Sequence, residues 1–214
     1  MTPTQIETSA RNKYNAIGDS MFSTDEILDL MWEGCSDMAR ECENIEGLYS
    51  TSSVISQQSY ALPTNAISIK RILYDGKKLM PINFRQDDAI TGLNQTTLST
   101  GAPQYYYIWQ ETFYLRPIPD SVKTLSIYTY NEPSVITAAS TIEIPTQYHM
   151  ALVNFITAEM AAKDMNFSAA QYYMDKWERA KIAAKRFEQK RKRGDAFSYV
   201  QNEENMVGSY LGMV

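Results

Sequence analysis

Histidine and cysteine are scarce in this chain of 214 residues, and their scarcity excludes several kinds of chemistry. The one histidine, His149, excludes a site built from several imidazoles and leaves a single candidate base for a serine or cysteine nucleophile. The two cysteines, Cys35 and Cys42, fall on an expected helix about 10 Å apart, so they cannot form a disulfide with each other. We therefore expect two buried thiols and no metal site.

The sequence also lacks glycine-rich phosphate loops and long apolar runs. No G-x-G-x-x-G or G-x-x-x-x-G-K pattern occurs, so nucleotide binding is not indicated. No run approaches the ~20 apolar residues that span a membrane, and residues 1–8 carry neither a positive leader nor an apolar stretch. We expect a protein made in the cytoplasm that uses no cofactor and does not contact a membrane.

Candidate acid and base residues are few. Asp87 and Asp88 are adjacent, and paired carboxylates can divide the acid and base roles of an enzyme. Neighbours in sequence usually point in different directions, so a solvated turn or short helix is the simpler interpretation. His149 lies at the start of an expected helix, where a packing or surface role is the simpler one. We expect no enzyme.

Two helices are predicted before residue 46. Thr4 and Glu7 have the spacing of a capping box for the first helix, and Gly18 suits its end. Ser23 repeats the start signal, and the second helix runs to about Asn44. Its buried stripe is expected to contain Ile27, Met31, Met38 and Cys42.

A β-rich module follows, because residues 49–136 are rich in Tyr, Thr, Ile and Val and are interrupted by Pro and Gly. The dipeptide Asp75-Gly76 predicts a tight hairpin between strands at 67–74 and 78–82. Further strands are expected at 105–109, 111–116 and 123–130. Such strands must close into a small sandwich or barrel, or pack on helices, to be stable.

Two more helices are predicted after Pro145. The first ends near Asn166, and Ser168 with Gln171 caps a long amphipathic helix that Gly194 stops. The apolar arc of this last helix is expected to contain Tyr173, Trp177, Ala180, Ala184 and Phe187.

This order of elements predicts an α+β protein. A four-helix bundle of two N-terminal and two C-terminal helices would carry an inserted small antiparallel β-sandwich or barrel, followed by an extended C-terminal tail. The expected divisions are 1–46 and 141–194 for the bundle, 47–140 for the β-module and 195–214 for the tail.

Basic residues crowd into one segment although the net charge is −5. The cluster contains Lys185, Arg186, Lys190, Arg191, Lys192 and Arg193. Such cations can bind DNA phosphates without reading sequence, bind an acidic partner, or complement the dipole at a helix end. All three interpretations stay open.

An aromatic run comprises Tyr105, Tyr106, Tyr107 and Trp109. It has the composition of a stacking platform for sugars or bases. Alternate residues of a strand face opposite ways, however, so the run more simply divides between core and surface.

Six turn-forming motifs occur in a characteristic order. They are Leu62-Pro63, Tyr74-Asp75-Gly76, Gly101-Ala102-Pro103, Pro117-Ile118-Pro119-Asp120, Tyr130 at a strand end, and Ile144-Pro145. Over residues 24 to about 190 the chain resembles the head-to-tail adaptor proteins of tailed phages, especially the tail-tube gatekeeper type of short-tailed phages.

The resemblance implies a structural virion protein at the head–tail junction, synthesised in the host cytoplasm. It implies a ring, usually of about twelve copies, that joins the portal to the tail nozzle or tail tube and continues the channel for genomic DNA without sequence recognition. It further implies that the C-terminal segment grips the portal. The candidate contacts are Phe197, Tyr199, Tyr210 and Leu211.

Three alternatives remain. A tail-completion or neck protein of another tailed phage would share the helices, strands and ring symmetry. A β-sandwich carbohydrate-binding module is supported only by the aromatics from Tyr105 to Trp109. An enzyme would have to depend on Asp87, Asp88 and His149.

Overall fold

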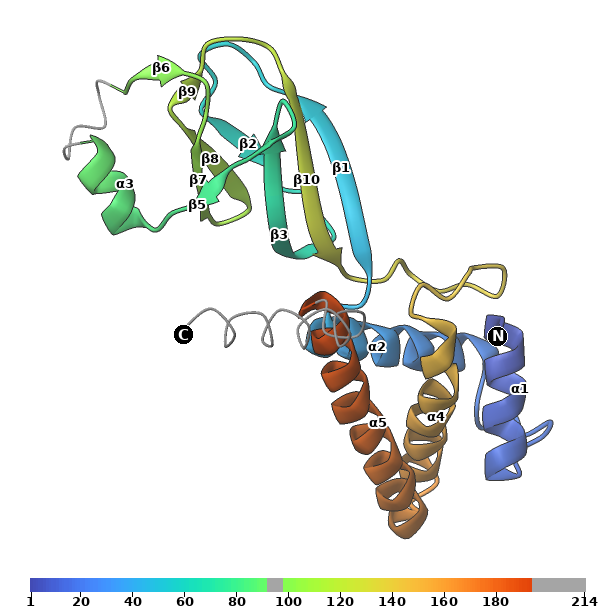
Figure 1. The fold of residues 1–214 in the computed structure, drawn as a ribbon. Coiled ribbons are helices and arrows are strands. Elements are labelled where there is room, and N and C mark those ends of the chain that lie inside the picture. The colour runs from blue at the N-terminus through green and yellow to red at the C-terminus, as the bar shows by residue number, and fades with distance from the viewer. Residues whose placement is uncertain (92–97, 194–214) are drawn as a thin grey trace, which may run out of the picture. The chain divides into compact units, whose positions relative to one another are not determined.

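The chain is α+β, as predicted, and divides into two compact units (Figure 1). The computed structural model describes residues 1–91 and 98–193. The helical unit combines Met1–Asn44 with the described part of the chain after Glu132, and the β-unit is Ile45–Glu132. Because two separate segments build the helical unit, the β-unit is an insertion in the chain.

The first helix, α1 (Pro3–Tyr14), begins two residues earlier than its predicted capping box. The Thr2 hydroxyl accepts a hydrogen bond from the Gln5 backbone N–H, and the Gln5 side chain accepts one from the Thr2 N–H. The box predicted at Thr4 and Glu7 is therefore wrong. The proline at the first helical position explains the shift, since it has no N–H to satisfy and its φ is already helical.

The end of α1 was also misplaced, whereas the start of the next helix is confirmed. Asn15 adopts the left-handed conformation (φ 60°) and ends α1, ahead of the predicted Gly18. In α2 (Thr24–Cys42), the Ser23 side chain caps the first turn as expected. Glu43 is left-handed (φ 49°) and ends this helix.

The C-terminal helices are α4 (His149–Lys163), which follows a short 3₁₀ turn at Thr146–Tyr148, and α5 (Phe167–Arg193). The cap predicted at Ser168 is wrong. The Asn166 side chain accepts the backbone N–H three residues further on, and this bond starts α5 earlier. Within the helical unit, α4 contacts α1, α2 and α5.

Close packing in the helical unit depends on a glycine. A Cβ on Gly34 of α2 would lie 2.6 Å from Leu152 Cδ1 and 2.7 Å from Phe155 Cδ1 of α4, which is closer than carbon atoms can approach. The missing side chain therefore lets α2 lie against α4. The largest side chains buried in this unit are Ile6, Ile27, Met31, Met38, Ile144, Leu152 and Trp177.

The inner face of α5 is only partly as predicted. Trp177 and Ala184 are buried, but Phe187 is 49% exposed, and Glu188 takes the inward position. The Tyr148 hydroxyl donates to Glu188 Oε1 (3.1 Å), and Arg191 Nε donates to Oε2 (2.7 Å). Burial and the Glu188 charge raise the pKa of Tyr148 to about 12, so its hydroxyl keeps its proton. A carboxylate whose two oxygens accept hydrogen bonds can therefore occupy the buried position where an aromatic residue was expected.

Two four-stranded sheets form the body of the β-unit. Sheet A contains, in spatial order, β1 (Glu46–Ser52), β10 (Thr124–Asn131), β3 (Ala66–Tyr74) and β4 (Lys77–Lys78). Sheet B contains β2 (Ser59–Ala61), β8 (Thr112–Arg116), β7 (Tyr105–Trp109) and β5 (Met80–Pro81). A short pair consists of β6 (Thr100–Gly101) and β9 (Ile118–Pro119). Neighbouring strands of sheet A are antiparallel, and in sheet B only the β5–β7 pair is parallel.

The predicted hairpin is confirmed, but its second arm is not one strand. Asp75 (φ 49°) and Gly76 (φ 76°) are both left-handed, as a two-residue turn between β3 and β4 requires. The strand expected at 78–82 is wrong, because the chain passes from sheet A to sheet B at Leu79. That leucine is 1% exposed, and its burial explains the crossing.

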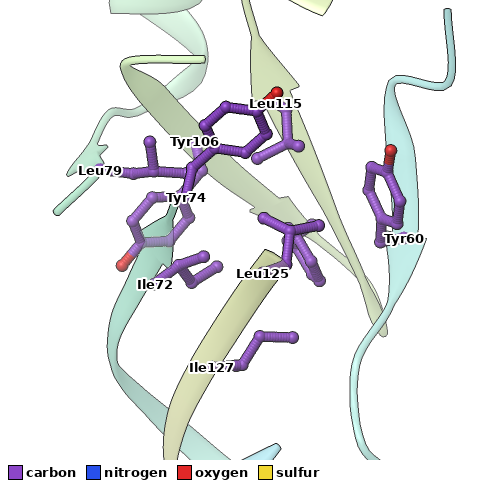
Figure 2. Packing of buried hydrophobic residues seen from close by; sticks show 9 residues of the cluster. Tyr60, Ile72, Tyr74, Leu79, Tyr106, Leu115, Leu125 and Ile127 are labelled. Atoms are coloured by element: carbon purple, nitrogen blue, oxygen red, sulfur yellow. The ribbon is translucent and has the colours of Figure 1, made fainter. Parts of the chain in front are cut away.

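One hydrophobic cluster receives side chains from both sheets (Figure 2). Its members are Tyr60, Ile72, Tyr74, Leu79, Tyr106, Phe113, Leu115, Leu125 and Ile127. Leu125 and Ile127 alternate along β10, and the Tyr60 and Phe113 rings stack at 5.4 Å. These contacts hold sheets A and B together.

We predict that Gly34→Val lowers the free energy of unfolding of the helical unit by roughly 2 kcal/mol, since its side chain overlaps Leu152 and Phe155. Urea denaturation followed by circular dichroism measures this loss. The control, Glu33→Val, places the same residue on the exposed side of α2 and should cost only a few tenths of that. Equal losses in both variants would contradict close packing at Gly34.

Candidate interaction surfaces

A buried ion pair joins α3 (Phe84–Thr91) to the end of β8. Arg116 Nε donates to Asp87 Oδ1 (2.7 Å) and Nη2 donates to Oδ2 (3.0 Å), while the two residues are 2% and 0% exposed. Nη2 also donates to the Tyr107 hydroxyl (3.1 Å). The short helix expected at Asp87 is confirmed, but the expected solvation is wrong, because the guanidinium compensates the buried carboxylate. With both its oxygens bound in this way, Asp87 is poorly placed to act as a base.

The ion pair holds α3 where its first residue completes an aromatic surface. Phe84 packs against Tyr107 and meets Trp109 edge-on, each with ring centroids 5.1 Å apart. Tyr107 and Tyr114 stack in parallel at 4.8 Å. With Gln58, these four aromatic residues line a groove of about 490 Å³, which we call the aromatic groove.

The aromatic run divides between core and surface, as predicted. Tyr106 and Tyr107 are buried, whereas Trp109 is 53% exposed. Phe84 and Tyr114 were not predicted to belong to this surface, because they reach the groove from α3 and β8 rather than from the run itself. Only the folded chain brings these residues together.

Three of the six cations in the predicted basic cluster form intramolecular ion pairs. The pairs are Lys185 with Glu41, Arg191 with Glu188 and Lys192 with Glu43, at 2.7, 2.7 and 2.8 Å. Arg186 and Lys190 are exposed and form no ion pair with any residue that the structure describes. The cluster therefore presents fewer free cations than its sequence suggests.

The remaining predicted contacts lie outside the described residues. These are the four tail residues Phe197, Tyr199, Tyr210 and Leu211, together with the side chain of Arg193. Their role in binding a partner stays a prediction.

Asp88 is half-buried in α3, whereas the histidine and the two cysteines are buried in the helical unit. His149 is 4% exposed, its Nε2 lies 3.1 Å from the Ile144 carbonyl oxygen, and burial lowers its pKa. Burial raises the pKa of Cys35 to about 12 and that of Cys42 to about 11. Across residues 1–91 and 98–193, no group of three or more His, Cys, Asp and Glu side chains could hold a metal ion. Over the same ranges, no helix is long and apolar enough to cross a membrane.

Comparison with known proteins assigns this architecture to the head-to-tail adaptors of phages. The model of the SU10 adaptor protein family matches residues 1–201, a range that takes in the whole β-unit and all five α-helices. The chain therefore belongs to the SU10 adaptor protein family. A search of curated proteins finds no match. The resemblance drawn from the turn motifs is confirmed by the family match.

We predict that Asp87→Asn lowers the stability of the β-unit by about 3 kcal/mol, because it leaves the Arg116 guanidinium buried without its counter-charge. Hydrogen exchange of the β7 and β8 amides reports this loss locally. The double variant Asp87→Leu/Arg116→Met removes both charges at similar volume and should recover most of it. Unchanged exchange in Asp87→Asn would show that the pair does not anchor α3.

We also predict that neither thiol reacts quickly in the folded chain. With the pKa values raised to about 11 and 12, no more than about one thiol in a thousand is ionised at pH 8, and the thiolate is the reactive form. Dithionitrobenzoate should label both cysteines within minutes in urea and neither in buffer. Rapid labelling of the folded chain would contradict the burial of Cys35 and Cys42.

Proposed function

We propose that this chain is one subunit of a ring at the head–tail junction of a phage virion. The ring, of about twelve copies, joins the portal to the tail nozzle or tail tube and continues the DNA channel. The observation that carries the proposal is the family match over residues 1–201, which takes in both units.

The chain meets the physical requirements of such a ring. A cyclic arrangement reuses two different faces of each subunit and needs no active site. The net charge of −5 favours passage of DNA without strong binding, since phosphates are attracted by surplus cations. Three cations of the basic cluster are already paired with carboxylates, which leaves, among the side chains that the structure describes, Arg186 and Lys190 for DNA or an acidic partner.

The C-terminal segment is the proposed portal contact. Residues 195–214 contain three aromatic side chains, three carboxylates and no lysine or arginine. Aromatic anchors that enter pockets on a partner contribute much of the binding energy at protein interfaces. We assign this role to the segment as a whole, with Phe197, Tyr199, Tyr210 and Leu211 as its anchors.

Two alternative functions would differ from the adaptor in what the chain binds. A neck or tail-completion protein would bind a tail tube in place of a nozzle. The aromatic groove, with Trp109 half exposed, is the observation that favours a carbohydrate-binding module. Binding of the isolated chain to a glycan array, abolished by Trp109→Ala, would favour that function over the adaptor.

Deleting residues 195–214 tests the portal contact. We predict that the shortened chain no longer co-sediments with purified portal rings, while its thermal unfolding stays cooperative, because the deleted segment supplies the anchors and not the core. A matched control exchanges only the four anchors for serine and should lose binding to a similar degree. Full binding by the shortened chain would refute this role.

A further inference from the structure

One face of α5 is an uninterrupted row of exposed residues without a carboxylate. Its members recur at alternating steps of four and three residues, which places them on one side of a helix. They are Tyr172, Lys176, Arg179, Ala183, Arg186 and Lys190, and all are exposed. We call this face the basic row.

The cations of the basic row are not neutralised by any carboxylate of residues 1–91 and 98–193. Lys176 lies 4.1 Å from the ring centroid of Tyr172, a cation–π contact that leaves its charge in place. Arg179, Arg186 and Lys190 form no ion pair with the part of the chain that the structure describes. The side of α5 that meets α2 is a different one, where Lys181 and Lys185 bind Asp37 and Glu41.

The helical unit also carries an acidic counterpart. Asp25, Asp29 and Glu33 are exposed at steps of four along α2, and we call them the acidic row. None has a cationic partner among residues 1–91 and 98–193. Like charges at this spacing repel each other. Glu159 of α4 lies near this row, and burial together with the Glu33 charge raises its pKa.

These two rows are exceptions in a unit that pairs many of its charges. The internal pairs include Glu7 with Arg11, Glu26 with Lys163, Asp37 with Lys181, Glu41 with Lys185 and Glu43 with Lys192. The described part of one copy therefore carries two surfaces of opposite charge that it does not pair internally, on different helices of the same unit.

We propose that the acidic row of one copy docks on the basic row of the next copy and forms the contact between subunits. The inference rests on the proposed ring and names the faces that build it. The acidic row is about 12 Å long and Arg179 to Lys190 spans about 16 Å, so the charges can meet along their length. A contact between two different faces is the head-to-tail kind from which rings close.

A second copy fits the basic row better than DNA does. Tyr172 and Ala183 lie within the row, and Ile182 and Phe187 beside it are 50% and 49% exposed. Phosphates would not cover these apolar side chains, whereas a protein surface can. DNA would also leave the acidic row unpaired, while a second copy neutralises both rows at once.

Charge reversal tests the contact with matched variants. The first is Arg179→Glu/Arg186→Glu, which makes the basic row acidic. The second is Asp29→Lys/Glu33→Lys, which makes the acidic row basic. The control, Lys77→Glu/Lys78→Glu, makes the same change of charge as the first variant at exposed positions of β4 in the β-unit. Far-UV circular dichroism and melting curves confirm that all variants fold.

Carbodiimide cross-linking detects the contact between the two rows, because it joins a carboxylate directly to an adjacent amine. Equal amounts of unlabelled and ¹⁵N-labelled full-length chain are cross-linked at high concentration, alone and with portal rings. Peptides of mixed isotope identify links between copies. The expected links join Lys176 or Lys190 to Asp25, Asp29 or Glu33.

The yield of these links between copies should fall about tenfold or more in either reversed variant and stay unchanged in the control. A one-to-one mixture of the two reversed variants should restore it, because reversed rows match each other and natural rows match each other. No links in the natural chain, undiminished links in a reversed variant, or no rescue in the mixture would overturn the proposal. Loss of duplex-DNA binding in Arg179→Glu/Arg186→Glu with undiminished links would assign the row to DNA.

Portal binding is measured separately by co-sedimentation, so the two proposals can fail independently. Links between the two rows without portal binding would keep this contact and overturn the portal role. Portal binding without these links would keep the adaptor role and overturn this contact.

Discussion

The buried pair of Asp87 and Arg116 is the interaction on which the surface of the β-unit depends. Its two parallel hydrogen bonds attach α3 to β8, and that attachment positions Phe84 against Tyr107 and Trp109. A buried charge pair is seldom the most stabilising choice for a core, but it is demanding in geometry. In this chain it fixes one orientation of α3, and the aromatic groove exists only in that orientation.

Charge is organised differently in the helical unit. Ion pairs between helices, such as Asp37 with Lys181 and Glu41 with Lys185, join α2 to α5 over a closely packed apolar core. Exposed pairs of this kind add little stability singly. These pairs neutralise the sides on which the two helices meet, while the basic row stays on another side of α5 and the acidic row lies on α2. A head-to-tail ring uses two different faces of each subunit, and the two rows are our candidates for those faces.

Features set by neighbouring residues could be predicted from the sequence, whereas those set by distant partners could not. The Asp75-Gly76 turn and the Ser23 cap each depend on a few adjacent residues. Asp87 looked solvated because its partner is 29 residues away. Phe187 was expected on the inner face of α5, because the tyrosine that holds Glu188 there is 40 residues away. The aromatic groove was missed for the same reason, since α3 and β8 contribute half of its rings.

The central claim, that this member of the SU10 adaptor protein family is a portal-bound subunit, is tested most directly by mass. The measurement is mass photometry of the purified chain, alone and after mixing with portal rings from the same phage. The account predicts that the mixture contains portal rings heavier by about twelve copies of the 24.4 kDa chain. Portal rings of unchanged mass, at chain concentrations well above those of the portal, would contradict it.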